Sequence, residues 1–522
     1  MRGVMRILLF LLSLSVSVFV IHVDDLCAQQ PALLGRITSD TMGVLFGRQI
    51  ISLGDQNDDG RSELLVGDTR FSMHLYYGSD VVDSVADLTF PNTVNPANIG
   101  DVNGDGKDDF TMRLGVYGTY VRAVYFGGSS IDTIPDLVFG YPQYYPSRSV
   151  VRGDFNNDET DEIVSQGSDG WSICFYDLQA AADSLPNLRM TPANILYDGY
   201  AFGECIVTGD FNGDNFPDLA CNLRRKPADT SNGQVYIYWG GPDFDTIPDV
   251  VISRGGDWLP ERQYFGDVMV SPGDFNGDGF DDLYVSSHAT EDTSAFLYWG
   301  GPDIDSFPDL TILGYRDRAA LAGDIDNDGY PDIITSMPTQ WSGIGWVYLY
   351  YGGPDVDSLP DFELYINDLP GYKTQFGMDV AGIGDFNGDG IDDFAFSCVH
   401  AGSIGTVYIY AGFDGSTSTG GSGGGGVVLP VDFELFQNYP NPFNPTTTIA
   451  FQLPLKSHVE IDVFNVLGQL VATLVSAEYP AGSHSVVWDG TDAAGDEVAS
   501  GVYMYRLTAG DVVFSRKMVL AR

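Results

Sequence analysis

Short strand-like runs, rich in β-branched and aromatic residues, follow one another along residues 32–414. Three of them read VYIYW (235–239), FLYW (296–299) and VYLYY (347–351), and each leads into a Gly-Gly-Pro-Asp turn. Helical periodicity is nearly absent, which disfavours an α/β fold or a helical bundle. The pattern therefore predicts an all-β protein.

One acidic pattern of nine residues, D-x-[ND]-x-D-[G/N/E]-x-x-[DE], divides this region into repeats. It occurs seven times, starting at Asp55, Asp101, Asp154, Asp210, Asp274, Asp324 and Asp385. Consecutive copies start 46 to 64 residues apart, the size of a four-stranded blade with variable loops. We therefore expect a seven-bladed β-propeller with the blade order strand, acidic loop, strand, long loop, strand, turn, strand.

The seventh blade has no fourth strand of its own, because a Gly/Ser tract follows its third strand, Val407 to Tyr410. The segment Ala32 to Ile37 precedes the first blade and is free to fill this place. Pairing the two ends of the propeller in one blade would close the ring and remove two free strand edges. We predict this closure.

The acidic loops predict calcium binding. Positions 1, 3 and 5 carry short oxygen-bearing side chains, position 7 offers a backbone carbonyl, and position 9 returns a carboxylate from the next strand, a set that suits Ca²⁺. A single Asp-Gly or Asn-Gly pair could simply make a hairpin turn, but seven copies with spaced carboxylates would repel one another without a cation. The predicted ligands are Asp55, Asn57, Asp59, Arg61 and Glu63; Asp101, Asn103, Asp105, Lys107 and Asp109; Asp154, Asn156, Asp158, Thr160 and Glu162; Asp210, Asn212, Asp214, Phe216 and Asp218; Asp274, Asn276, Asp278, Phe280 and Asp282; Asp324, Asp326, Asp328, Tyr330 and Asp332; and Asp385, Asn387, Asp389, Ile391 and Asp393.

Position 6 of these loops is expected to take a left-handed conformation, which Gly adopts without steric cost and Asn tolerates. Gly stands there in five loops and Asn215 in the fourth, whereas the third loop has Glu159. We therefore expect the third site to be the weakest or empty. Since no open coordination position lies beside a nucleophile, the role expected for up to seven Ca²⁺ ions is structural.

The DFNGDG loops, with upstream Phe-Gly pairs at Phe46-Gly47, Phe202-Gly203, Phe265-Gly266 and Phe376-Gly377, resemble the FG-GAP repeats of integrin α-subunit propellers. The resemblance covers about residues 32–414 and implies a binding scaffold. It also implies that the calcium loops share one face and that ligands meet the opposite face. Only four blades keep the Phe-Gly pair, and the integrin leg domains and transmembrane helix are missing, so integrin partners do not carry over.

The net charge excludes one class of function. The chain has 72 acidic and 25 basic residues, a formal net charge of −47, which excludes nucleic-acid binding by bulk electrostatics. Hydrophobic residues make up 44%, enough for a core, so the acidity does not indicate a disordered polyanion.

The N-terminus predicts secretion. Arg2 and Arg6 precede an uncharged run that ends before Asp24, typical of a signal peptide, and cleavage is expected after Ala28. No later stretch is long and apolar enough to span a membrane. Cys205 and Cys221 flank the fourth acidic loop and could form a disulfide or remain buried free thiols.

The C-terminal region predicts a second domain. A Gly/Ser-rich linker is expected over 415–430, between a propeller at 29–414, after the signal peptide at 1–28, and a small Ig-like β-sandwich at 431–522. The stretch FQNYPNPFNPTTTI (436–449) and the later VFNVLGQLV, SGVYMYRL and KMVL resemble type IX secretion C-terminal sorting domains and the Ig-like domain of flagellar hook-capping proteins. That resemblance implies export across an outer membrane by dedicated machinery. A plain adhesive Ig-like module is the alternative.

The loops expected on the ligand face carry aromatic and basic side chains suited to sugars or to protein hot spots. They are Trp171, Trp258, Trp341, Trp346, Tyr264 and Tyr372, with the basic cluster Arg224, Arg225 and Lys226. Packing between blades explains each Trp equally well, and the basic cluster could be only a solvated loop. His288 and His400 lie in loops that could share this face, but neither has an adjacent nucleophile or metal partner.

No catalytic constellation stands out, so we expect a non-enzymatic protein. The first hypothesis is a secreted or surface-displayed, calcium-stabilised and monomeric module for cell adhesion or ligand binding, whose ligand is an extracellular glycan or protein. The alternatives are an extracellular polysaccharide-degrading enzyme and a structural component of a surface layer.

Overall fold

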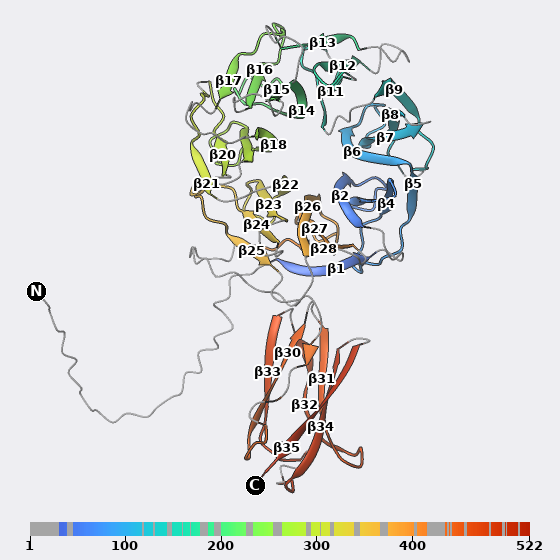
Figure 1. Cartoon of the computed structure of the whole chain (residues 1–522), viewed down its shortest axis with the longest axis vertical. Coiled ribbons are helices and arrows are strands. Elements are labelled where there is room, and N and C mark those ends of the chain that lie inside the picture. Colours follow the sequence, from blue (N-terminus) through green and yellow to red (C-terminus); the bar gives the residue numbers. More distant parts are fainter. Residues whose placement is uncertain are drawn as a thin grey trace, which may run out of the picture.

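The computed structural model describes residues 31–38, 45–116, 119–128, 131–143, 149–158, 160–167, 169–177, 186–192, 200–225, 233–253, 264–288, 294–302, 304–313, 318–338, 345–365, 374–400, 405–414, 434–435, 438, 441–453, 457–479, 482–492, 496, 498–509 and 512–521. The predicted signal peptide, the linker and Glu159 lie outside these residues. Seven four-stranded antiparallel sheets form a ring around a central axis (Figure 1).

Six blades are built from consecutive strands, which run in chain order from the innermost to the outermost. They are β2 (Phe46–Gly54), β3 (Glu63–Asp68), β4 (Ser72–Tyr76) and β5 (Leu88–Pro91); β6 (Thr93–Gly100), β7 (Asp109–Val116), β8 (Thr119–Tyr125) and β9 (Leu137–Gln143); β10 (Val150–Gly153), β11 (Glu162–Gln166), β12 (Ile173–Asp177) and β13 (Leu188–Met190); β14 (Tyr200–Gly209), β15 (Asp218–Arg225), β16 (Gln234–Tyr238) and β17 (Val250–Ser253); β18 (Tyr264–Gly273), β19 (Asp282–His288), β20 (Ser294–Tyr298) and β21 (Leu310–Leu313); and β22 (Arg318–Gly323), β23 (Asp332–Met337), β24 (Trp346–Tyr350) and β25 (Phe362–Tyr365).

The seventh blade closes the ring with both ends of the propeller. Its first three strands are β26 (Thr374–Gly384), β27 (Asp393–His400) and β28 (Thr406–Ala411), and the fourth is β1 (Ala32–Thr38). β1 pairs antiparallel with β28, with Leu33 opposite Tyr410 and Ile37 opposite Val407. The predicted closure is confirmed, and the backbone groups of the outer edge of β28 are paired.

The hydrophobic core of the propeller lies between blades. Seven clusters of buried side chains each join residues of two neighbouring blades, and together they run around the ring. One cluster, for example, brings Ile334 and Val347 of the sixth blade against Phe376 and Phe396 of the seventh. A blade exposes its apolar faces unless a neighbour covers them, so the closed ring is the unit that is stable.

The Phe-Gly pairs set the distance between blades. Phe376 is buried, and a Cβ on Gly377 would lie 2.7 Å from the Cβ of Ser336 in the preceding blade. Gly47 stands in the same relation to Ser397, again at 2.7 Å, and its φ is 86°. The glycine therefore provides both a left-handed backbone and room for the neighbouring sheet.

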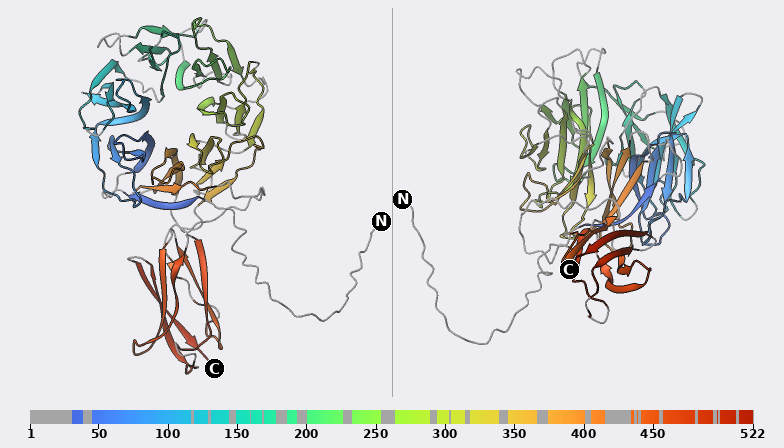
Figure 2. Two further views of the ribbon diagram at one scale, coloured as in Figure 1. Left: turned by 180° about the vertical axis from the view of Figure 1, so that it is seen from behind. Right: turned by 60° about the horizontal axis from the view of Figure 1, so that its bottom comes forward.

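The C-terminal domain is a two-sheet sandwich. One sheet contains β29 (Glu434–Leu435), β30 (Thr447–Leu453) and β33 (Gly482–Trp488), and the other contains β32 (Leu470–Tyr479), β31 (Ser457–Asn465), β34 (Gly501–Ala509) and β35 (Val512–Leu520). Trp488, Tyr505 and Phe451 lie in the core between them. The views in Figure 2 show the sandwich and the propeller from two further directions.

The predicted fold class is therefore confirmed: an all-β chain with a seven-bladed propeller and a small Ig-like sandwich. In the C-terminal domain the sequence predicts five strands and misses β29 and β32; the predicted runs are 448–453, 459–465, 484–488, 502–508 and 512–520. Among the described residues no disulfide joins Cys205 to Cys221, and Cys221 is buried.

Candidate metal sites

The seven acidic loops occupy the same place in every blade, between the first and second strands. The first strand of each blade ends in a glycine, and position 1 of the loop follows it directly. Position 9 is the first residue of the second strand. These position-9 residues are Glu63, Asp109, Glu162, Asp218, Asp282, Asp332 and Asp393, and all are buried.

The second loop shows how the side chains fold the backbone around the acidic centre. The carboxylate of Asp101 accepts hydrogen bonds from the N–H groups of Gly104, Asp105 and Gly106, at 2.6 to 3.1 Å. Asn103 accepts the N–H of Asp105 at 2.8 Å, and the carboxylate of Asp105 accepts the N–H of Lys107 at 2.9 Å. Positions 1, 3 and 5 thus face one another across a tight turn, as a cation site requires.

Position 6 has the left-handed conformation that the sequence predicts. Its φ is positive in all six loops where this residue is described: Gly60 (84°), Gly106 (86°), Asn215 (68°), Gly279 (96°), Gly329 (95°) and Gly390 (89°). Position 4 is left-handed too, which sequence reasoning missed: Asp58, Gly104, Asn157, Gly213, Gly277, Asn327 and Gly388 all have positive φ. The signal was present in the sequence, because only Gly, Asn and Asp stand there.

Position 9 ties the acidic loop to the turn after the third strand, which lies at the same end of the blade. The carboxylate of Asp282 accepts the N–H of Phe275 in its own loop at 2.9 Å and the N–H of Gly300, just after the third strand, at 2.9 Å. The same pair of contacts recurs at Asp109, Asp218, Asp332 and Asp393. In four of these loops the same Oδ2 also accepts the N–H of position 3, whereas Oδ1, which accepts the N–H after the third strand, keeps a further lone pair.

Two loops bring three carboxylates within 4.8 Å of one another: Asp55, Asp59 and Glu63 in the first loop, and Asp324, Asp326 and Asp332 in the sixth. Glu63 Oε1 and Asp326 Oδ1 are buried without a hydrogen-bond partner. Burial raises the pKa of Glu63 to about 8 and that of Asp326 to about 7, and the neighbouring aspartates contribute to both shifts. A buried, unpartnered carboxylate oxygen among other carboxylates fits a divalent cation, which would supply the missing partner.

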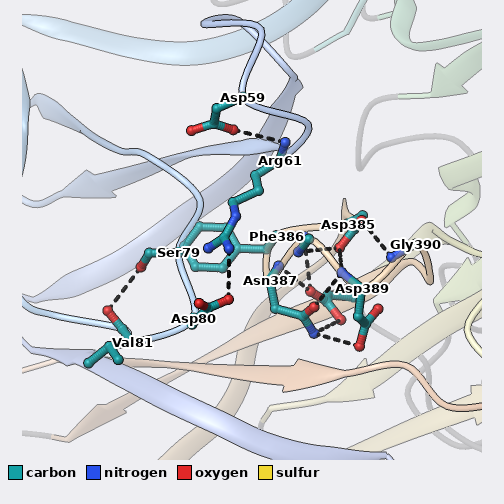
Figure 3. A network of polar contacts seen from close by, with 12 residues as sticks. Asp59, Arg61, Ser79, Asp80, Val81, Asp385, Phe386, Asn387, Asp389 and Gly390 are labelled. Atoms are coloured by element: carbon teal, nitrogen blue, oxygen red, sulfur yellow. Dashed lines mark hydrogen bonds and ion pairs between the residues drawn. The ribbon is translucent and has the colours of Figure 1, made fainter.

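Neighbouring loops also contact one another. The N–H of Ser62 in the first loop donates to the carbonyl of Asp385 in the seventh at 2.8 Å, and Arg61 pairs with Asp80 at 2.7 Å (Figure 3). Asp281 in the fifth loop accepts the N–H of Asp210 in the fourth at 2.8 Å, and Asp392 accepts that of Asp324 at 2.9 Å. These contacts between loops join the fourth loop to the fifth, the sixth to the seventh and the seventh to the first.

The predicted ligand-face residues fall into two groups. Trp258, Trp341, Tyr372 and Lys226 lie outside the described residues, as do the side chains of Tyr264, Arg225, His288 and His400. Trp171 is half-buried, and Trp346 stacks on Tyr348 with 6.0 Å between ring centroids and packs against the cluster between the fifth and sixth blades. Packing between blades thus accounts for Trp346.

Arg224 is not part of a free basic patch. It pairs with Glu204 at 2.9 Å and with Asp267 of the next blade at 3.3 Å. Among the described residues the chain forms no helix with the length and hydropathy of a membrane span.

Comparison with known families adds two matches. Residues 210–285 and 274–335 match the FG-GAP-like repeat, and residues 439–511 match the FlgD Ig-like domain. The propeller carries FG-GAP-like repeats. The C-terminal sandwich is a FlgD-type Ig-like domain.

Curated relatives include integrin alpha subunits. Integrin alpha-4 of Xenopus laevis is 30% identical over 216 residues, which cover 39% of this chain and 20% of the relative, and integrin alpha-5 of the same species is 24% identical over 273 residues, which cover 48% and 24%. The match therefore spans about a fifth to a quarter of the length of these relatives. Among solved structures, PorZ, a surface component of the type-IX secretion system of Porphyromonas gingivalis, is 12% identical with a TM-score of 0.27, covering 89% of this chain and 69% of PorZ.

Proposed function

We propose that this chain is a secreted β-propeller, held together by calcium, that acts as a non-enzymatic binding module for an extracellular glycan or protein. The observation that carries the proposal is the pair of buried, unpartnered carboxylate oxygens, Glu63 Oε1 and Asp326 Oδ1, each in a cluster of three carboxylates. Hard oxygen donors in that arrangement suit Ca²⁺ rather than a softer metal. The similarity to integrin alpha subunits and the FG-GAP-like repeats at residues 210–335 support the proposal.

The binding surface in this proposal is the end of the ring opposite the acidic loops. The second strands end and the third strands begin there, and the segments that join them vary in length and sequence, whereas the acidic loops repeat. Variable loops on a rigid closed scaffold are a common basis for recognition. The aromatic residues that we assign to this surface from the sequence are Trp171, Trp258, Trp341 and Tyr372.

We further propose the domain division 1–28, 29–414, 415–430 and 431–522, with removal of the first segment. The C-terminal Ig-like domain then serves export across an outer membrane, and the propeller is the part delivered to the cell surface or the medium. The match of residues 439–511 to the FlgD Ig-like domain supports the existence of this unit. Expressing the chain with and without residues 431–522, and measuring the protein in the medium, tests whether this domain directs export.

The experiment for binding is retention of the mature chain on glycan and matrix-protein arrays, in calcium and in chelator. Calcium-dependent retention on one ligand class, reduced by Trp171→Ala and by Trp258→Ala, would support the proposal. Failure of the calcium-loaded, folded protein to bind any array would contradict it for those ligand classes.

A further inference from the structure

The turns between third and fourth strands carry a second repeated pattern, which the calcium loops do not explain. It reads apolar, Asp, Ser or Thr, apolar, Pro or Ala, Asp. The five described copies are VDSVAD (82–87), IDTIPD (131–136), FDTIPD (244–249), IDSFPD (304–309) and VDSLPD (356–361). The copy of the third blade has Leu185 at the second apolar position, outside the described residues, and the seventh blade has no such turn because β1 supplies its fourth strand.

The two apolar positions of this turn differ in burial. The first one packs into a cluster between blades, as Ile131 and Ile304 do. The second one projects into solvent. Its exposed fractions are 73% for Val85, 70% for Ile134, 69% for Ile247, 76% for Phe307 and 66% for Leu359. We call these five the rim residues.

Folding explains the two aspartates and the first apolar residue of the turn, but not the rim residue. In the fifth blade, Asp305 accepts the N–H of Phe307 at 2.6 Å, and Asp309 accepts the N–H of Trp299 at the end of the third strand at 2.9 Å. Both contacts recur in the other four turns. The Asp residues thus hold a rigid turn, whereas a side chain about 70% exposed gains little from being apolar.

An isolated exposed apolar residue needs no explanation, but five at the same position of five blades do. Val, Ile, Phe and Leu alternate there, so apolarity is kept while shape varies. Each rim residue is flanked by two aspartates, two positions before and two after it. The repeated unit is therefore an apolar side chain between two carboxylates on a fixed turn.

The turns lie at the same end of the blades as the acidic loops. Gly300, which begins the fifth turn, donates its N–H to Asp282 of the acidic loop, and Arg61 of the first loop pairs with Asp80 of the first turn. Figure 3 shows this last pair with Ser79 and Val81 beside it. The rim residues consequently belong to the acidic end of the ring, away from the ligand-binding surface proposed above.

We propose that the rim residues form a second interaction surface, which binds a polypeptide segment whose apolar side chains are interspersed with Lys or Arg. The apolar side chains would cover the rim residues, and the basic groups would pair with the flanking aspartates, such as Asp305 and Asp309. Because the unit repeats from blade to blade, one partner can engage several turns at once and gain avidity.

Charge complementarity selects this partner over others. A second copy of the chain would bring another acidic rim against the first, since the formal net charge is −47. Anionic lipid headgroups are repelled for the same reason. A basic polypeptide with apolar side chains can cover the rim residue and pair with the two carboxylates beside it.

The test measures binding of a labelled helical peptide of Leu and Lys, with Leu on one face, by fluorescence anisotropy to the full chain at saturating calcium. A Leu/Glu peptide of the same length and periodicity is the charge control. The variant V85S/I134S/I247S/F307S/L359S leaves the charge unchanged and removes only the rim side chains. We expect its Kd for the Leu/Lys peptide to rise about tenfold or more, since buried apolar anchors dominate such contacts.

Phe71→Asn is the matched control, because Phe71 is also an exposed large apolar residue (53%) but lies in the turn between β3 and β4, at the other end of the blade. Asn tolerates the left-handed φ of 61° found there. This variant should bind like the wild type. If the five-residue variant does not fold, Phe307→Ser and Leu359→Ser, made singly, should each weaken binding.

An unchanged Kd in the rim variants would overturn the proposal, because attraction would then be due to net charge alone. Self-association or binding to anionic vesicles that is lost in the rim variant would overturn it too, in favour of a second copy or a membrane. Every measurement in this test uses calcium-loaded protein and a peptide probe. A negative result in the array experiment therefore does not change its outcome.

Discussion

At the scale of single residues, Glu63 tests whether the first loop holds a cation. Its Oε1 is buried without a partner next to Asp55 and Asp59. In chelator, Glu63→Gln should raise the free energy of unfolding of the propeller by about 1–2 kcal/mol, because the wild type must bury a charge or take up a proton to fold. In calcium the same variant should be less stable than the wild type, because one ligand of the ion is lost.

The measurement is denaturant unfolding of both proteins in both conditions, with calcium stoichiometry by titration calorimetry. Asp243→Asn, which removes a carboxylate from an exposed turn residue, is the control and should show no such reversal. A Glu63→Gln variant whose stability relative to the wild type is the same with and without calcium would contradict a metal in this loop.

Gly377 tests the role of the Phe-Gly pair. Its φ is 71°, and a Cβ would lie 2.7 Å from the Cβ of Ser336 and 3.1 Å from the carbonyl oxygen of Trp346. Gly377→Ala should destabilise the propeller by about 2–4 kcal/mol, from left-handed strain and from the forced separation of two blades. Denaturant unfolding at saturating calcium measures the loss.

Gly390→Ala serves as the comparison, because its φ is 89° but a Cβ there would meet nothing within 4 Å. It should cost about 1–2 kcal/mol, the backbone strain alone. Equal losses in the two variants would show that contact between blades is not what the glycine of the pair provides.

At the scale of elements, the contacts between acidic loops predict that neighbouring metal sites are coupled. Asp281 accepts the N–H of Asp210 at 2.8 Å, and its own N–H donates to the carbonyl of Asp210 at 3.2 Å. Asp281→Ala should therefore weaken calcium binding in both the fourth and the fifth loops, although it is a predicted ligand of neither. Titration calorimetry should show that two calcium sites are weakened. The control Asp243→Ala makes the same change of charge and should weaken none. A single weakened site in Asp281→Ala would contradict the coupling.

The contact between the seventh and first blades predicts a pH dependence. Asp379 of β26 accepts the N–H of Ile50 in β2 at 2.8 Å, and burial raises the pKa of Asp379 to about 7 from its ordinary value of 3.8. Between these two values the native state holds a proton that the unfolded chain has lost, so this residue makes stability fall as pH rises. The Asp379→Asn variant has no carboxyl group at this position, so its stability does not fall with pH for this reason.

Compared with the wild type, Asp379→Asn should therefore gain on the order of 2 kcal/mol in relative stability between pH 5 and pH 8. Denaturant unfolding of both proteins at the two pH values measures this difference. A relative stability that stays constant, or that falls as pH rises, would contradict the raised pKa.

Much of each blade could be predicted from its own sequence, because the acidic loop and the flanking strands lie close together in the chain. The left-handed residue at position 6 follows from Gly and Asn alone. The bond between Asp281 and Asp210 could not be predicted, since it joins residues 71 positions apart whose meeting depends on how the blades stack. β32 was missed because its exposed residues, such as Leu470, interrupt the alternation expected of a half-buried strand.

At the scale of the whole molecule, the closure of the ring was predictable from a missing strand at one end and a spare strand at the other. The rim residues were not, because exposure distinguishes Phe307 from Ile304 and sequence shows only that both are apolar. The predicted ligand surface also depends on the folded ring: Arg224 looked like part of a basic cluster, yet it pairs with carboxylates of two blades.

The chain carries a formal net charge of −47, and its acidic loops need a cation to offset the repulsion between their carboxylates. Seven loops place their carboxylates at one end of a single ring. If each binds calcium with the affinity typical of extracellular modules, each ion would add about 0.6–1.8 kcal/mol to the stability of the propeller at about 2 mM calcium. Summed over the ring, this is comparable with the stability of a typical domain. Removal of the ion should therefore loosen the propeller and leave the Ig-like domain, which contains none of the seven loops, unaffected.

Differential scanning calorimetry of the mature chain in calcium and in chelator tests this most directly. We expect two transitions, of which the larger, from the propeller, moves to a markedly higher Tm in calcium while the smaller stays in place. A propeller transition at the same temperature in both conditions would contradict the structural role of calcium.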